Sequence, residues 1–404
     1  MNAENQKPGQ AYESLEELAY DGTGAGLEAE QSADDTADIQ APFDPKQIDV
    51  ITQQRTVDLL MARLGHGELD LSPDFQRRAN LWSDGRKSGL IESMLLRIPI
   101  PSLYVSEDAD GNYQVVDGLQ RLCAIAHFVR VSSLNRALGT KLDPLRLTGL
   151  QSLGTELYEK AFDDLPRPLQ RRINETELTL HVIRPGTPSN VKFNIFSRIN
   201  QGGLPLTAQE IRNAIYPGKW RDHIRRMAVG SAFISATEGR IKAERLEDHE
   251  LILRFVALYS LRRDEKRHPD ENLDDFLNEF VSVRSATWSE DAWHKVESAF
   301  ERAMHAAPKV FGKMAFRKYS RSYEARRPIN RGLFETEAVA LASRTSQELD
   351  ILETRSNQVI KRFGEVFESD SAFIGALLYA TGKGLASNKR LEVIKLILEE
   401  VLHA

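Results

Sequence analysis

The sequence contains almost no cysteine: Cys123 is the single one in 404 residues. A lone cysteine cannot form an internal disulfide, and without clustered cysteines the chain has no thiolate zinc site. In an apolar helical stretch, a lone cysteine usually packs as a small buried hydrophobic residue. We therefore expect no redox role for Cys123.

Long apolar runs and several catalytic motifs are also missing. No run approaches the roughly 20 apolar residues that cross a bilayer, and the first residues lack the basic-then-apolar order of a signal peptide. We expect a cytoplasmic protein with no membrane partner. The chain has no G-x-x-x-x-G-K-[ST] loop, which excludes a P-loop ATPase. It also has no G-x-S-x-G elbow, the motif of the α/β-hydrolases. After His268 no pair of histidines has the spacing of metal ligands, so no His-Asn-His nuclease module is expected.

Charge is distributed unevenly along the chain. Residues 1–45 hold eleven acids and one base, Lys7, which gives this segment a net charge of −10. Since the whole chain has a net charge of −6, the remaining residues have a net charge of +4. This opening segment is also poor in large apolar residues, and we predict that residues 1–45 form a disordered acidic arm. The arm either keeps the protein soluble or competes with DNA for a basic groove.

Hydrophobic periodicity predicts an α+β domain over residues 46–216 and an all-helical domain over 217–404. Helical spacing runs through Val57, Leu60 and Leu64. Further helices are expected at 84–97, 120–129, 188–199 and, after a Thr207 cap, up to Tyr216; strands are expected at 69–71, 102–105, 113–116 and 178–183. Residues 132–174 resemble an insertion with short helices. Beyond residue 217 the strand patterns disappear.

The motif with the clearest chemistry is Asp117-Gly118-Leu119-Gln120-Arg121, between a strand and a helix. A glycine at that bend permits an unusual backbone angle or a close approach to a ligand. The first amides of the helix, together with the Arg121 guanidinium, suit a phosphate. Asp117 would be repelled by phosphate unless Mg²⁺ lay between them or it bonded a base or ribose. In the alternative, Asp117 and Gly118 form an ordinary turn and Arg121 is a solvated helix residue.

The wider pattern resembles the GmrS/GmrD-type restriction-endonuclease N-terminal family, whose fold is ParB/sulfiredoxin-like. The resemblance covers roughly residues 50–216. It is carried by four blocks, which are Gly67–Arg77 followed by Trp82, Leu90–Ser93 with Ile98–Pro101, Val115–Leu122, and Phe196–Gly203 with Glu210, Arg212 and Asn213. The family usually has Gln where this chain has Leu119. A Leu119 side chain that touched the ligand would weaken phosphate chemistry, whereas one that packed inward would not.

The resemblance implies binding of a nucleoside triphosphate, and in some members its hydrolysis, coupled to the control of DNA cutting or nicking. Carried over by position, the catalytic candidates are Asp117, Gln120 and Arg121, with Mg²⁺ held through Asp117. The nucleotide-binding candidates are Gln76, Arg77, Gly118, Arg198 and Asn200. Three arginines in one pocket, Arg77, Arg121 and Arg198, would complement the negative charge of a polyphosphate. Alternatively, Arg77 forms a salt bridge with a neighbouring aspartate and Arg198 lies on a helix surface.

A basic segment at residues 317–331 contains six basic residues against one acid, with two tyrosines between them. Arginine and lysine neutralise phosphates, and tyrosine stacks on unpaired bases. The DNA-binding candidates are Arg317, Lys318, Arg321, Arg326 and Arg327. A solvated segment paired with acids elsewhere is the alternative. The basic turn at 167–172 is a weaker candidate.

Taken together, the sequence predicts a nucleotide-binding component of a DNA restriction or anti-phage defence system. DNA is the expected partner, with a nuclease or another defence protein as a second. An alternative of a different class is a non-catalytic DNA-binding or adaptor module whose pocket serves only as a ligand-gated switch. A third hypothesis is direct nicking of DNA by this chain.

Overall fold

The computed structural model describes residues 26–28, 49–71, 82–199, 207–216, 218–261, 265–320, 327–379 and 381–404. The chain divides into two compact units, one of residues 40–217 and one of residues 218–404 together with 1–39. The first unit is α+β and the second is helical, so the predicted fold class is confirmed. Apart from Gly26–Glu28, the predicted acidic arm lies outside the described residues.

A mixed five-stranded sheet forms the centre of the first unit, with strand order β1-β5-β3-β4-β2. The strands are β1 (Val50–Thr56), β2 (Leu69–Asp70), β3 (Leu103–Glu107), β4 (Tyr113–Asp117) and β5 (Glu177–Ile183). β1–β5 and β3–β4 pair antiparallel, whereas β3–β5 and β2–β4 pair parallel. The predicted strands 69–71, 102–105, 113–116 and 178–183 are thus confirmed within two residues, but β1 was not predicted.

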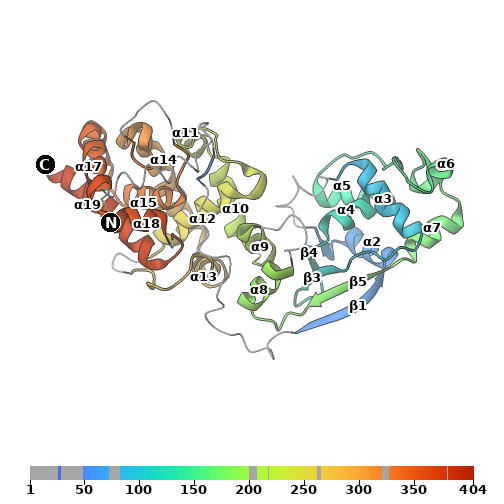
Figure 1. Ribbon diagram of the computed structural model, residues 1–404. Coiled ribbons are helices and arrows are strands. Elements are labelled where there is room, and N and C mark those ends of the chain that lie inside the picture. Colours follow the sequence, from blue (N-terminus) through green and yellow to red (C-terminus); the bar gives the residue numbers. More distant parts are fainter. Residues whose placement is uncertain are drawn as a thin grey trace, which may run out of the picture. The chain divides into compact units, whose positions relative to one another are not determined.

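Helices cover the sheet because alternate residues of its strands are apolar. In β5, Leu178, Leu180 and Val182 are buried, as expected when every second side chain faces the core. Figure 1 shows α2, α3, α4 and α7 together on one side of the strands. The helices of this unit are α2 (Val57–His66), α3 (Asp84–Leu95), α4 (Leu119–Val129), α5 (Val131–Leu138), α6 (Gly154–Leu157), α7 (Arg167–Asn174), α8 (Ser189–Ile199) and α9 (Ala208–Ile215).

Two residues of the family-like blocks have structural roles in α9. Thr207 and Glu210 form a capping box, in which the Thr207 hydroxyl accepts from the Glu210 N–H and the Glu210 carboxylate accepts from the Thr207 N–H. This arrangement satisfies two N–H groups that the start of a helix leaves unpaired. Arg212 is completely buried and donates to the Gln209 side-chain oxygen. These positions therefore stabilise the fold.

The second unit is a helical domain built around α15 (Arg331–Ala342), in which every residue from Gly332 to Ala342 is buried. The other helices are α10 (Trp220–Ala228), α11 (Ser231–Ala236), α12 (Glu247–Tyr259), α13 (Leu273–Glu279), α14 (Glu290–Val310), α16 (Ser346–Thr354), α17 (Ser356–Ser369), α18 (Ser371–Leu378) and α19 (Gly384–His403). A buried ion pair joins Glu335 of α15 to Arg390 of α19 at 2.7 Å. Because a buried charge needs a partner, this pair fixes the two helices against each other.

Across the described ranges, no helix is both long enough and apolar enough to span a bilayer.

The predicted insertion, residues 132–174, includes α6, α7 and nearly all of α5, and α3 holds its middle part to the core. The buried Glu92 carboxylate accepts from the N–H groups of Gln151, Ser152 and Leu153 at 3.0, 2.7 and 2.8 Å. One turn earlier, the Ser88 hydroxyl accepts from the Thr148 N–H at 3.0 Å. Burial alone would raise the pKa of Glu92, but the three backbone donors outweigh it and lower the pKa.

Replacement of Glu92 by Gln should destabilise the protein by about 1–3 kcal/mol, because the amide places its NH₂ group against backbone donors. Since the folded pKa of Glu92 lies below its unfolded value, its stabilising contribution is complete above the ordinary pKa of 4.5 and is lost as the pH falls through the folded pKa. The stability difference between Glu92→Gln and wild type should therefore narrow in acid. Urea unfolding at pH 7 and pH 3 measures it. The exposed Glu156→Gln is the matched control, and equal stability of the two variants at pH 7 would contradict this role.

Candidate nucleotide site

The turn from β4 into α4 is built around Gly118. Gly118 has φ 90° and ψ 12°, the left-handed region that favours glycine. A Cβ placed on it would lie 2.1 Å from the Leu103 Cδ2 atom of the neighbouring strand. Both the backbone angle and the close packing therefore require glycine, and the sequence prediction of an unusual backbone angle here is confirmed.

The Arg121 guanidinium holds this turn in place. Its Nη2 donates to Asp117 Oδ2 at 2.8 Å, and its Nη1 donates to the carbonyl oxygens of Pro101 and Ser102 at 2.5 and 3.0 Å. The Arg121 side chain is only 15% exposed. Arg121 is thus neither a solvated helix residue nor an unengaged cation, because it joins the β4–α4 turn to the segment that enters β3.

Asp117 keeps one carboxylate oxygen available. Its side chain is 34% exposed, and among the residues described its Oδ1 atom has no hydrogen-bond partner. A half-exposed carboxylate with one oxygen fixed by arginine and the other open can receive a cation or a donor N–H or O–H group. This geometry fits either predicted role of Asp117, magnesium binding or contact with a base or ribose.

Within the described part of the chain, no side chain caps the first turn of α4. Its first intrahelical bond runs from the Leu122 N–H to the Gly118 carbonyl at 3.0 Å, so the preceding amides belong to the uncapped, partially positive end of an eleven-residue helix. Leu119 packs against the hydrophobic core of the domain. The exchange of the family's usual Gln for Leu119 therefore places an apolar side chain inward.

Only some of the predicted nucleotide ligands belong to the described residues. Gln76, Arg77 and Asn200 lie outside the described residues, and Arg198 belongs to α8 with a side chain that is not described. The Gln120 side-chain oxygen is buried. The convergence of Arg77, Arg121 and Arg198 on one pocket thus stays a prediction.

The DNA-binding candidates occupy unequal positions. Arg317 is 2% exposed and donates to the carbonyl oxygens of Ala315 and Arg327. Lys318 is also buried and pairs with Glu28. Arg321 and Arg326 lie outside the described residues, and Arg327 is partly exposed. In this conformation neither Arg317 nor Lys318 presents its charge to solvent.

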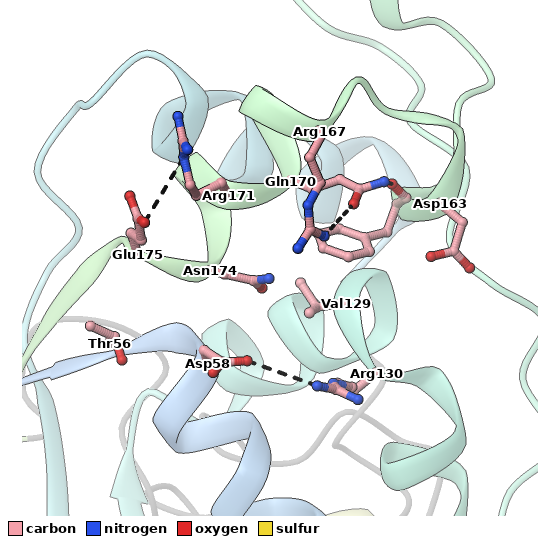
Figure 2. Close-up of a pocket in the computed structure, with 11 residues that line it drawn as sticks. Thr56, Asp58, Val129, Arg130, Asp163, Arg167, Gln170, Arg171, Asn174 and Glu175 are labelled. Carbon is pink, nitrogen blue, oxygen red and sulfur yellow. Dashed lines mark hydrogen bonds and ion pairs between the residues drawn. The ribbon is translucent and has the colours of Figure 1, made fainter.

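A separate pocket of about 620 Å³ lies at the other end of α4, where Val129 and Arg130 line it with residues of α7. Figure 2 shows that its charges are largely paired: Arg130 with Asp58, Arg171 with Glu175, and Arg167 with the Gln170 amide. Three arginines face three acids, which are Asp58, Asp163 and Glu175. This balance does not suit a polyphosphate. Sequence reasoning noted only its basic turn, residues 167–172.

The single cysteine lies in the hydrophobic core. Cys123 is buried, and burial raises the pKa of its thiol to about 12, which agrees with the predicted role as a small hydrophobic residue. Throughout the described parts of the chain, no group of three or more His, Cys, Asp or Glu side chains is arranged to hold a metal ion.

The fold and this turn define a class: an α+β domain with a strand–glycine–helix turn at its sheet, joined to a helical unit. Residues 61–217 match the family model described as GmrSD restriction endonuclease, N-terminal domain. No curated protein and no solved structure matches the chain. The family suggests a component of a restriction or defence system and implies an interaction with DNA. The ParB/sulfiredoxin likeness remains a prediction.

Gly118→Ala should destabilise the protein by about 3 kcal/mol, the sum of left-handed backbone strain and overpacking against Leu103. Gly111→Ala is the matched control, because Gly111 also has a positive φ (83°) but a Cβ there would meet no atom within 4 Å. The control should lose only about 1 kcal/mol. Thermal and urea unfolding measure both variants. Equal losses would show that close packing at Gly118 contributes nothing.

Proposed function

We propose that this chain binds the phosphates of a nucleoside triphosphate at the turn Asp117–Arg121 and uses the bound nucleotide to control an interaction with DNA in a restriction or defence system. The observation that carries the proposal is the combination at one bend: a required glycine, an uncapped helix start, and a carboxylate with one open oxygen. Backbone amides at a helix start bind phosphate without needing a side chain.

The roles within the turn follow from the contacts. Gly118 gives the backbone the left-handed angle that starts α4 at this bend, and the first amides of α4 donate to the phosphate. Asp117 directs its open oxygen to a Mg²⁺ ion, which would offset the repulsion between carboxylate and phosphate. Arg121 is a positioning residue in this scheme, because its donors are directed to Asp117 and two carbonyl oxygens. The cations that complement a polyphosphate are assigned to Arg77 and Arg198.

The engagement of Arg121 also favours a second candidate, a nucleotide-gated switch without turnover. A guanidinium that already donates to three acceptors would have to break those bonds before it stabilised developing charge on a transferred phosphoryl group. Tight binding with no phosphate release would identify the switch. Steady phosphate release that Asp117→Asn abolishes would identify the enzyme.

Asp117→Asn should lower affinity for nucleoside triphosphate about tenfold when Mg²⁺ is present and little when it is absent. Asparagine retains an oxygen that accepts from Arg121 but removes the charge that attracts the cation, and tenfold corresponds to about 1.4 kcal/mol. Calorimetric titration of the four nucleoside triphosphates, with and without Mg²⁺, measures this.

The control is Arg130→Ala, which alters charge at the other end of α4 and should leave affinity unchanged. The proposal is contradicted if the wild-type protein binds none of the four nucleotides, or if Asp117→Asn binds them as well as wild type does with Mg²⁺ present.

A further inference from the structure

The three described residues of the N-terminal segment dock on the basic segment of the helical unit. Leu27 forms a parallel β-bridge with Ile329. The Glu28 N–H donates to the Ile329 carbonyl at 2.9 Å, and the Ile329 N–H donates to the Gly26 carbonyl at 3.1 Å. An extended strand added to another backbone in this way gains affinity from the main chain and specificity from its side chains.

The specific side chain here is Glu28. One carboxylate oxygen pairs with the Lys318 ammonium, and the other accepts from Asn330 Nδ2 at 2.9 Å. The Glu28 backbone carbonyl accepts from Arg331 Nη1 at 2.7 Å. Lys318 and Asn330 are buried beneath these contacts. Glu28 thus supplies anionic and carbonyl oxygens to two cations and an amide.

The same donors would suit a nucleic-acid phosphate. A phosphate offers the anionic oxygens that the Glu28 carboxylate now provides, and lysine and arginine form charge-assisted hydrogen bonds with either group. The Lys318 side chain is 3% exposed while Glu28 is paired with it, and a buried ammonium is costly without an anion. Arg331 also pairs with Glu247, at the longer distance of 3.9 Å.

We propose that residues 26–28 are an intramolecular mimic of DNA phosphate, which keeps Lys318 and Arg331 closed to DNA until the segment is displaced. This inference rests on the proposed interaction with DNA and adds its regulation. Displacement removes the Glu28 oxygens from both cations.

Glu28→Gln in the full-length chain tests the mimic. Replacing the Glu28 carboxylate by an amide removes the negative charge that Glu28 places against Lys318. The affinity of the protein for a DNA duplex should therefore rise about fivefold to tenfold. The slope of log affinity against log salt should become steeper by about 2, since each cation that neutralises a phosphate contributes about 0.9. Fluorescence anisotropy at several salt concentrations measures both quantities.

Two matched variants isolate the cause. Glu30→Gln removes an equal charge two residues away and should change DNA affinity less than twofold. Lys318→Gln combined with Glu28→Gln should cancel most of the gain. If Glu28→Gln lowers the melting temperature, a synthetic peptide of residues 22–34 provides an independent readout: it should displace DNA from the variant, and the same peptide with Gln at position 28 should not.

The outcomes separate the two proposals. If wild type and Glu28→Gln bind DNA with equal affinity and the peptide does not compete, the mimic is wrong and the DNA interaction stands. If no variant binds DNA at any salt concentration, the DNA part of the proposed function is wrong, and the mimic with it.

Discussion

The candidate site depends on one arginine. The Arg121 guanidinium bonds a carboxylate at the end of β4 and two carbonyl oxygens that precede β3, and a planar fork of donors does this with little loss of freedom. These bonds hold the β4–α4 turn, and with it the first amides of α4, against the segment that enters β3. Lysine could not hold all three acceptors in one plane, so an Arg-to-Lys exchange would not be conservative here.

The same principle recurs across the fold, since buried charges hold segments that are distant in sequence. Glu92 anchors the insertion through three backbone N–H groups, and Glu335 joins α15 to α19 through Arg390. Each satisfied charge is costly to leave without its partner. The family-like blocks therefore combine residues that stabilise the domain, such as Glu92 and Arg212, with residues of the turn that could meet a ligand.

Periodicity predicted most of the α+β domain but not β1. The helices α2, α3 and α4 begin or end close to the expected positions because their apolar residues recur at helical spacing and caps such as Thr56 and Ser83 precede them. β1 carries the sequence VITQQRT, whose polar residues hide the strand pattern. It is stabilised by pairing with β5, including the Gln54–Thr179 hydrogen bond, and an edge strand with an exposed face needs few apolar side chains.

The candidate site was only partly predictable, because some of the groups that build it are distant in the sequence. Residue types in the Asp117–Arg121 motif indicated a glycine bend and a nearby cation, and both are present. The acceptors of Arg121, Pro101 and Ser102, are 19 or 20 residues away, beyond the reach of a local pattern. Local sequence patterns predict even less about the basic segment, because Lys318 is paired with Glu28, which lies 290 residues earlier in the chain.

Backbone amide NMR of the full-length protein during titration with a nucleoside triphosphate and Mg²⁺ tests the central claim most directly. Phosphate at the β4–α4 bend predicts the largest shifts at the amides of residues 118–121. Shifts confined to the pocket between α4 and α7, at residues 56–58, 130 and 167–175, would contradict it.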